Sequence, residues 1–190
     1  MPSARSAIFV GAPRTGKTHA AIAWTLEWAR LEPKPILCID STRASNFAAW
    51  PRAASLPQLG AMLWRARTSR VAWLPADRAE VDACIRGVRE LGNVHVLVDE
   101  SAFWLDSARG RGGELERLLR SARHSGVTIA LTTQYAGADI PQTVWGCSPE
   151  VYVFRTKSPR ALAALGRLFG APAVAPVASL PDRKYLRFDT

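Results

Sequence analysis

Residues 11–18 read GAPRTGKT, which matches in full the phosphate-binding loop pattern GxxxxGK[ST]. The apolar run 7–10 (AIFV) precedes the loop as a buried strand, and residues 17–31 follow it with a helical pattern. Glycines let the backbone curl so that successive N–H groups face an anion, and the start of the helix adds partial positive charge. An accidental match in a glycine-rich turn is disfavoured by this strand–loop–helix context. The stretch predicts a site for nucleotide phosphates.

The positions of this loop have distinct expected roles. The Lys17 ammonium would contact the β- and γ-phosphates, and the Thr18 hydroxyl would coordinate Mg²⁺. The expected cofactors are therefore ATP and Mg²⁺. The expected nucleotide-binding residues are Gly11, Ala12, Pro13, Arg14, Thr15, Gly16, Lys17 and Thr18.

Length and charge narrow the class of protein. A chain of 190 residues can bury a core of its own, so we expect one domain over 1–190, with 171–190 as a tail or edge-strand extension. A net charge of +9 favours an anionic partner such as nucleic acid or a membrane surface. An arginine-rich proteome is the alternative source of this charge, because 21 of the 25 basic residues are Arg.

The cysteines and the hydropathy favour a cytoplasmic protein. Cys38, Cys84 and Cys147 are odd in number, far apart and without CxxC spacing, which predicts neither disulfides nor a zinc site. No apolar run approaches the roughly 20 residues of a membrane helix. We expect a cytoplasmic protein.

Strand-like and helix-like segments alternate along the chain, a pattern typical of an α/β fold with a mostly parallel sheet and helices on both faces. The expected strands are 6–10, 35–40, 71–74, 94–99, 127–133 and 150–155, with a late edge strand near 183–188. The expected helices are 17–31, 77–91, 113–124 and 158–169, with a short one near 57–66.

Two adjacent carboxylates, Asp99 and Glu100, end the apolar strand 94–99. Acidic residues commonly follow buried strands. Here, however, Asp99 lies 82 residues after Lys17, in a chain that already contains a phosphate loop. In that context Asp99 would join Thr18 in holding Mg²⁺, and Glu100 would polarise the water that attacks the γ-phosphate.

Gln134 directly follows the strand 127–133. This strand comes after a basic helix that ends at Gly126. The tips of parallel strands share one edge of a sheet, where ligands bind. If this strand lies between those carrying Gly11 and Asp99, Gln134 can sense the γ-phosphate. A surface polar residue at a strand end is the alternative.

The order phosphate loop, hhhhDE, then RxxG, a hydrophobic strand and TQ resembles the HerA/FtsK superfamily of DNA-pumping ATPases. The likeness spans about residues 6–170, and the compact chain is most similar to small genome-packaging ATPases of tailless, internal-membrane viruses. The resemblance implies a RecA-like, additional-strand core, a homo-oligomeric ring (usually a hexamer), arginines acting in trans, double-stranded DNA in the pore, and capsid vertex or portal partners. It also implies a protein of the host cytoplasm that can associate with the virion.

The sequence departs from the family after the TQ pair, where Tyr135 stands in place of a frequent arginine. The trans-acting arginine must then lie elsewhere, and four positions are open. Arg123 and Arg160 match motif positions and are favoured as catalytic residues. The other two candidates are Arg120 and Arg155.

Arginines also suggest where DNA would bind. The glycine- and arginine-rich segment 106–113 could form a pore loop in which Arg109 and Arg111 contact phosphates without reading bases. Arg117 and Arg120 follow on one helix face. A plain connector followed by a solvated helix face is the alternative interpretation.

Three other functions compete with a DNA pump. A Zot-type phage extrusion ATPase has a similar core, although such proteins usually carry a membrane helix. A nucleoside-type kinase would fit the chain length, but zinc-ribbon cysteines are missing and the RxxG…TQ block would have no role. A non-catalytic nucleotide switch is disfavoured by Glu100.

Overall fold

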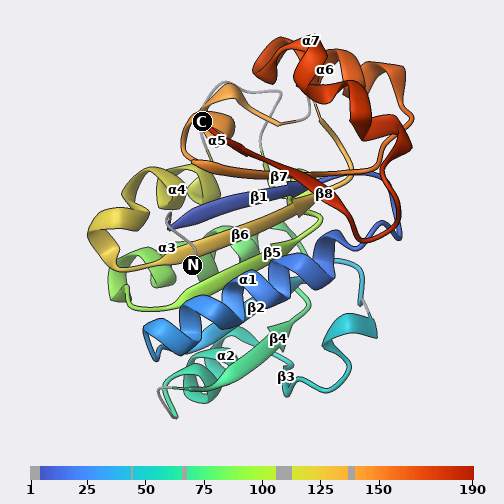
Figure 1. The fold of residues 1–190 in the computed structure, drawn as a ribbon. Helices are drawn as coiled ribbons and strands as arrows, with labels where there is room; N and C mark the ends of the chain where they lie inside the picture. The colour runs from blue at the N-terminus through green and yellow to red at the C-terminus, as the bar shows by residue number, and fades with distance from the viewer. Residues whose placement is uncertain (1–4, 44, 66–67, 106–112, 137–139) are drawn as a thin grey trace.

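The computed structural model describes residues 5–43, 45–65, 68–105, 113–136 and 140–190. Within these residues the strands form one sheet of eight, in the order β3-β4-β2-β5-β6-β1-β7-β8 (Figure 1). The strands are β1 (Ser6–Val10), β2 (Ile36–Asp40), β3 (Arg52–Ala53), β4 (Arg70–Trp73), β5 (His95–Asp99), β6 (Thr128–Thr133), β7 (Glu150–Phe154) and β8 (Tyr185–Asp189).

The sheet is parallel except at one edge. Strand β6 pairs in parallel with both β1 and β5, so an additional strand separates the phosphate-loop strand from the carboxylate strand, as the sequence predicts. Strand β8 pairs antiparallel with β7, which confirms the late edge strand. The C-terminal ends of β1, β5 and β6 therefore meet at one edge of the sheet.

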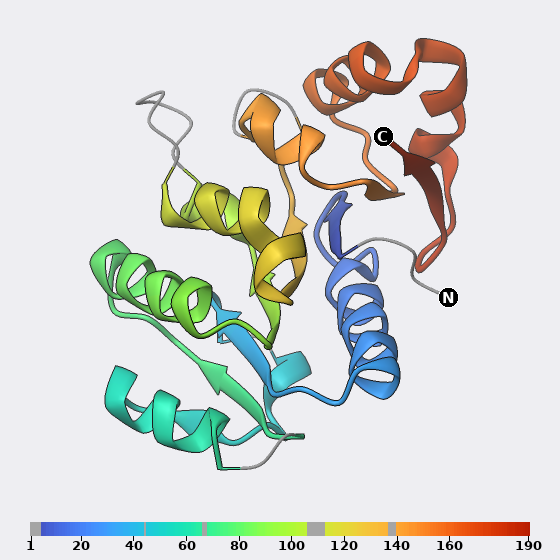
Figure 2. The ribbon, with the colours of Figure 1, turned by 90° about the vertical axis from the view of Figure 1, so that its left-hand side faces the viewer.

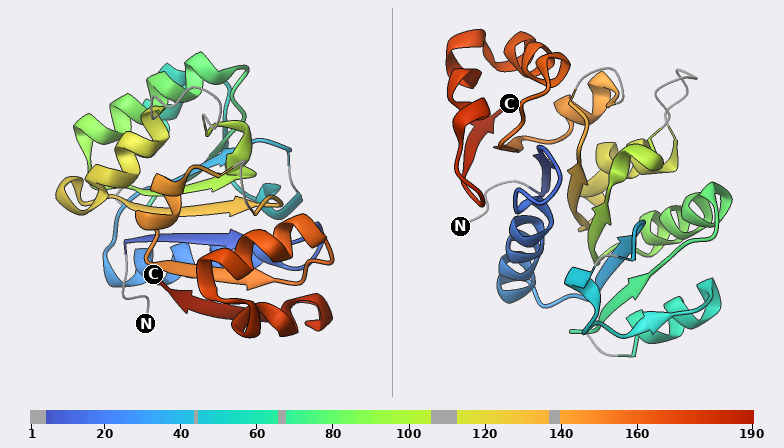
Figure 3. Two further views of the ribbon diagram at one scale, coloured as in Figure 1. Left: turned by 90° about the horizontal axis from the view of Figure 1, so that it is seen from above. Right: turned by 90° about the vertical axis from the view of Figure 1, so that its right-hand side faces the viewer.

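Helices cover both faces of the sheet unequally. Helix α1 packs against β1, β5 and β6 on one face, and α2 to α7 pack on the other (Figures 2 and 3). The helices are α1 (Lys17–Leu31), α2 (Leu56–Leu63), α3 (Arg78–Leu91), α4 (Glu114–Ser125), α5 (Gln142–Gly146), α6 (Pro159–Phe169) and α7 (Ala171–Val174), with 3₁₀ turns η1 (Ser45–Phe47), η2 (Ser101–Phe103) and η3 (Ala175–Ser179).

Local capping explains where several helices begin. The Asp77 side chain accepts the Glu80 N–H at 2.9 Å, and Glu80 in turn accepts the Ala76 N–H at 2.8 Å, so both orphan donors are satisfied. Ser158 caps α6 ahead of Pro159 in a similar way. The predicted strands and long helices match the observed ones to within two residues at each end, whereas β3, α5 and α7 were not predicted.

The two faces hold two apolar clusters, which follow from the alternation of side chains along each strand. Ile8, Val96 and Ile129 point to the face covered by most of the helices. Phe9 and Leu97 point toward α1 and pack with its indole side chains. Cys38 and Cys84 are buried core residues, and burial raises the pKa of both thiols. None of the helices in the described residues is long and apolar enough to cross a membrane.

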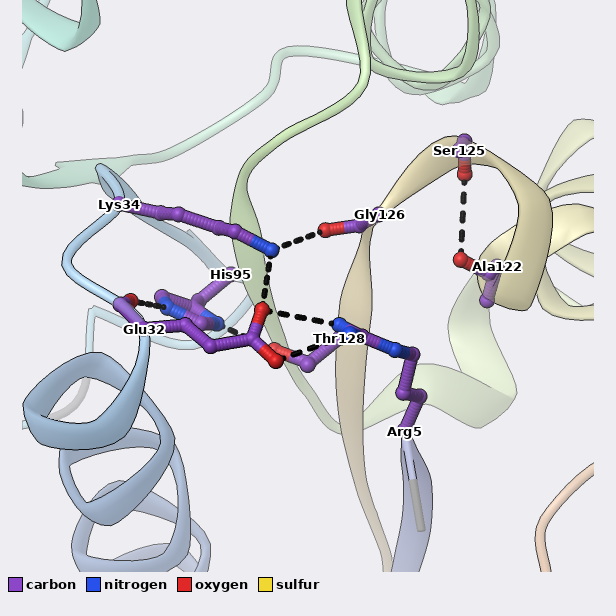
Figure 4. Close-up of polar contacts among 8 residues, drawn as sticks. All are labelled: Arg5, Glu32, Lys34, His95, Ala122, Ser125, Gly126 and Thr128. Atoms are coloured by element: carbon purple, nitrogen blue, oxygen red, sulfur yellow. Dashed lines mark hydrogen bonds and ion pairs between the residues drawn. The ribbon is translucent and has the colours of Figure 1, made fainter.

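A polar network lies at the N-terminal ends of the central strands, at the opposite end of the sheet from the phosphate loop (Figure 4). The Arg5 guanidinium donates to both oxygens of Glu32 at 2.8 and 3.1 Å. Lys34 pairs with the same carboxylate and donates to the Gly126 carbonyl at 2.8 Å. The fully buried His95 ring contacts the Glu32 carbonyl at 2.8 Å through Nε2 and the Thr128 hydroxyl through Nδ1. These contacts tie the C-terminal end of α1 to β1, β5 and β6.

The His95 ring predicts a pH-dependent stability. Burial lowers the pKa of His95 below its usual value, so the folded protein holds the neutral ring, with Nε2 donating to the Glu32 carbonyl. Between that lowered pKa and the unfolded value of about 6.5, the unfolded chain binds more protons than the folded one. The free energy of unfolding should therefore fall as the pH drops below about 6.5.

Urea titrations of wild type and His95→Gln between pH 5 and 8 test this expectation. The variant should lose about 1–3 kcal/mol at neutral pH and have a flatter pH dependence. The exposed His124 supplies a control, because His124→Gln should keep the wild-type pH dependence. Parallel stability curves for wild type and His95→Gln would contradict the assignment.

Candidate nucleotide-binding site

The loop after β1 is anchored by backbone hydrogen bonds at both of its flanks. The Gly11 N–H donates to the Thr133 carbonyl at 3.3 Å, and the Ala12 N–H donates to the Arg155 carbonyl at 2.9 Å. A Cβ atom at Gly11 would lie 2.7 Å from the Cβ of Phe154, so only glycine fits there. The loop thus passes tightly between the ends of β6 and β7.

The loop ends in a helix terminus that is open to an anion. Gly16 adopts a left-handed φ of 102° and precedes α1 without a side-chain cap. The first N–H groups of a helix have no intrahelical partner and attract negative charge. This backbone geometry suits the phosphate cradle expected from the GAPRTGKT motif.

Lys17 lies across its own loop. Its ammonium donates to the Ala12 carbonyl at 2.9 Å, and the residue is only 5% exposed. Burial lowers the pKa of Lys17, while the nearby charges of Glu100 and Asp99 oppose that shift. A largely desolvated cation therefore stands beside two carboxylates, and an incoming phosphate would give it an anionic partner.

Asp99 lies at the centre of a set of hydroxyl groups. The Thr18 hydroxyl donates to Asp99 Oδ1 at 3.0 Å, and the Thr132 hydroxyl donates to the same atom at 2.9 Å. The hydroxyl of Thr42, two residues after β2, donates to Asp99 Oδ2 at 3.3 Å. A carboxylate and a hydroxyl fit Mg²⁺, which takes one or two carboxylates and completes its shell with water and substrate phosphates.

Glu100 and Gln134 are in direct contact. The Glu100 carboxylate accepts the Gln134 backbone N–H at 3.2 Å and the Gln134 amide at 2.9 Å. The Glu100 backbone adopts a left-handed φ of 49°, a strained conformation that is common at functional sites, and its N–H donates to the Thr132 hydroxyl at 3.0 Å. Thr132 therefore bridges Asp99 and Glu100.

Lys17, Thr18, Asp99, Glu100 and Gln134 line one cavity of about 730 Å³ at the C-terminal ends of the strands. The sequence predicted that the loop, both carboxylates and Gln134 lie there. Thr132, which contacts Asp99 and Glu100 without lining the cavity, was not predicted, because a hydroxyl inside a strand carries no recognisable pattern. The lining residues that were not predicted are His19, Thr42, Asn46 and Arg183.

The C-terminal segment closes one side of the phosphate loop. The Arg183 N–H donates to the Thr15 carbonyl at 3.0 Å, and Asp182 pairs with Arg155 at 2.5 Å. A Cβ atom at Gly16 would lie 3.2 Å from the Cα of Arg183, so the two backbones are close. The segment expected to be a tail is therefore part of the wall of the site.

Of the candidate arginines whose placement is described, Arg155 lies beside the phosphate loop and pairs with Asp182, and the others lie away from the cavity. Arg160 is exposed in the first turn of α6, and Arg120 is exposed on α4. Arg117 is also exposed and pairs with Glu114 at 2.8 Å. Three predicted residues fall outside what the structure describes: Arg109, Arg111 and the side chain of Arg123.

A mostly parallel sheet with an additional strand between the phosphate-loop strand and the carboxylate strand defines the additional-strand class of P-loop NTPase folds. Glu100 at the end of β5 and Gln134 at the tip of β6 complete the arrangement. The chain has this fold, which confirms the class predicted from the sequence.

No family model and no curated protein matches the sequence, but solved structures match the fold. The genome-packaging NTPase B204 from Sulfolobus turreted icosahedral virus 2, in complex with ATP-γS, has a TM-score of 0.78 at 18% identity, covering 100% of this chain and 93% of that chain. VirB4 of Thermoanaerobacter pseudethanolicus has a TM-score of 0.62 at 8% identity, covering 97% of this chain and 88% of that chain. The N-terminal domain of zonular occludens toxin from Neisseria meningitidis has a TM-score of 0.51 at 16% identity, covering 81% of this chain and 78% of that chain. These likenesses show the P-loop NTPase fold that the sequence predicts.

Proposed function

We propose that this protein is an ATP-hydrolysing motor that moves double-stranded DNA and packages a viral genome into a capsid. One observation carries the proposal: Lys17, Asp99, Glu100 and Gln134 line a single cavity in a chain that shares its fold, over its whole length, with a viral genome-packaging NTPase. The motor would work in the host cytoplasm and join the particle at a capsid vertex or portal.

The roles of the site residues follow from the contacts. The loop N–H groups and Lys17 would hold the phosphates, and Thr18 and Asp99 would hold Mg²⁺, which would neutralise charge on the β- and γ-phosphates. Glu100 would accept a proton from the attacking water. The Gln134 amide donates a hydrogen bond to the Glu100 carboxylate at 2.9 Å. A γ-phosphate that accepted this hydrogen bond in its place would free the carboxylate to accept a hydrogen bond from that water.

Assembly into a ring would complete the site. Arg14 and Arg183 are the arginines that line the cavity among the described residues, and neither matches a family position for a trans-acting arginine. Arg160 is exposed and has no ion-pair partner among the described residues, so it is available to a neighbouring subunit. We propose a homo-oligomeric ring, taken as a hexamer from the family resemblance, with Arg160 or Arg123 acting in trans.

DNA would contact the ring through arginine side chains. Arg117 and Arg120 are exposed on α4, which begins directly after the segment that contains Arg109 and Arg111. A net charge of +9 favours a polyanionic partner in general. Phosphate contacts of this kind hold the duplex without selecting a base sequence.

A Zot-type extrusion ATPase is the second candidate, because the same fold comparison includes a zonular occludens toxin domain. The packaging proposal is favoured since the likeness to the viral NTPase is greater, with a TM-score of 0.78 against 0.51. A nucleoside kinase would instead transfer the γ-phosphate to a nucleoside, which would contradict the proposal directly.

ATP hydrolysis measured with and without long duplex DNA, over a range of salt concentrations, tests the proposal. DNA should stimulate hydrolysis, and the stimulation should fade as salt rises, because phosphate contacts release counterions. Arg109→Ala combined with Arg111→Ala should keep basal hydrolysis, remove most of the stimulation, and reduce the salt slope by up to about two contacts per engaged subunit.

The exposed Arg65 and Arg70 supply the comparison for this experiment. Replacing both with Ala should leave DNA stimulation unchanged if segment 106–113 is the pore loop. If stimulation instead disappears only in the Arg65 and Arg70 variant, the DNA contact belongs to that patch. Absence of any DNA effect on wild-type hydrolysis would contradict a DNA pump.

A further inference from the structure

A second cavity, of about 420 Å³, adjoins the phosphate cavity. The two cavities share three lining residues, Gly16, His19 and Arg183, so they adjoin at the last turn of the phosphate loop. The second cavity runs from there between α1 and β8. Its volume falls within the range of small-molecule sites, about 300–1,000 Å³.

Aromatic rings form the floor of this second cavity. Phe9 and Tyr152 stack with ring centroids 4.6 Å apart and planes 4° apart. The Tyr185 ring contacts Tyr152 and Phe154, with centroids at 5.2 and 5.3 Å. All four side chains point to the face on which α1 packs, and Phe9, Tyr152 and Phe154 are almost fully buried there. Tyr185 lies on the edge strand β8 and is 47% exposed, so it is the ring of this group that a ligand can reach.

A buried carboxylate fixes the geometry of the floor. Glu150 accepts hydrogen bonds from the Trp24 indole at 2.8 Å and from the Tyr152 hydroxyl at 2.9 Å. The Arg187 guanidinium reaches the other oxygen of Glu150 at 3.2 Å. Three elements, α1, β7 and β8, are thereby held in register around the cavity. Such preorganisation reduces the entropy cost of binding a flat ligand.

We propose that this cavity binds the base and ribose of the nucleotide, with the base stacked on the exposed Tyr185 ring, which the buried aromatic floor supports. The proposal rests on the proposed function, because it assumes that the triphosphate occupies the cradle of Gly16 and Lys17. Purines should bind more tightly than pyrimidines because they offer a larger ring surface for stacking.

The cavity has little means of distinguishing adenine from guanine. Among the described residues, none of the buried side-chain atoms that lack a hydrogen bond belongs to the cavity lining. Discrimination by hydrogen bonding requires such fixed, desolvated groups facing the edge of the base. ATP and GTP should therefore bind with affinities within a few-fold of each other.

Isothermal titrations with Mg²⁺ and four probes (ATP, GTP, CTP and inorganic tripolyphosphate) separate the base site from the phosphate site. Ala23 is exposed on α1 and lines the second cavity alone, so Ala23→Trp should fill the space without disturbing the core. This variant should weaken ATP and GTP binding at least about tenfold. Tyr185→Ala should weaken both about three- to tenfold. Tripolyphosphate affinity should stay at the wild-type value in both variants.

Ala79→Trp is the matched control, because Ala79 is an exposed alanine on α3 that lines neither cavity. Unchanged ATP affinity in Ala23→Trp, or equal losses of ATP and tripolyphosphate, would overturn the base site. If Ala23→Trp instead changes only the oligomeric state, the aromatic floor is a contact between subunits. Failure of the proposed function is a separate result: wild type and Lys17→Ala would then bind tripolyphosphate equally or not at all.

Discussion

Glu100→Gln should bind ATP with nearly wild-type affinity while its turnover falls by about 10²–10⁴-fold. The substitution keeps the size of the side chain, so the loop and Lys17 can still hold the phosphates. The amide cannot accept a proton from water, and only this step is lost. Single-turnover hydrolysis and equilibrium binding of ATP, measured on the same preparation, should show the kcat effect without a matching change in Kd.

Glu90→Gln provides the control, because Glu90 is an exposed glutamate on α3 that does not line the cavity. It should leave turnover and affinity unchanged. Gln134→Ala extends the experiment, since it removes the 2.9 Å contact to Glu100 without removing the carboxylate. Its turnover should fall less than that of Glu100→Gln. Normal turnover in Glu100→Gln would remove this residue from the mechanism.

Mixing two inactive variants should restore hydrolysis. Lys17→Ala disables the site of its own subunit, whereas Arg160→Ala disables the site of the neighbour that Arg160 completes. In a mixed ring, a subunit with intact Lys17 can lie beside one with intact Arg160, and that interface has both. A trans-acting arginine contributes about 10³–10⁵ in rate in related phosphoryl-transfer enzymes, so the recovered activity should stand far above either variant alone.

Specific activity of the wild type should also rise with protein concentration, because separate subunits lack the arginine. Lys157→Ala serves as the control, since Lys157 is exposed two residues before α6 begins. This variant should keep its activity alone and should restore activity to neither of the inactive variants. If Arg160→Ala is fully active, the same mixing experiment with Arg123→Ala tests the other favoured position. Activity that does not depend on concentration, in a subunit that stays monomeric, would contradict the ring.

Much of the fold could be predicted because its signals are local. The Gly11–Thr18 motif, the strand that ends in Asp99, and the strand that ends at Thr133 are each contiguous and strongly patterned. Parallel strands joined by crossover helices place their C-terminal ends at one edge, so Lys17, Glu100 and Gln134 were expected to meet if the strand before Gln134 lies between the other two. The arginines acting in trans stay a prediction, because they depend on a neighbouring subunit.

The sequence by itself determined the class of fold and the chemistry of the phosphate site. Only the tertiary structure decided that Arg183 contacts Thr15, that Thr132 bridges the two carboxylates, and that Tyr185 of β8 stays exposed beside the buried rings under α1. These contacts join residues more than thirty, and in one case more than a hundred and sixty, positions apart. No local pattern encodes such a pairing, because it depends on which strand lies beside which.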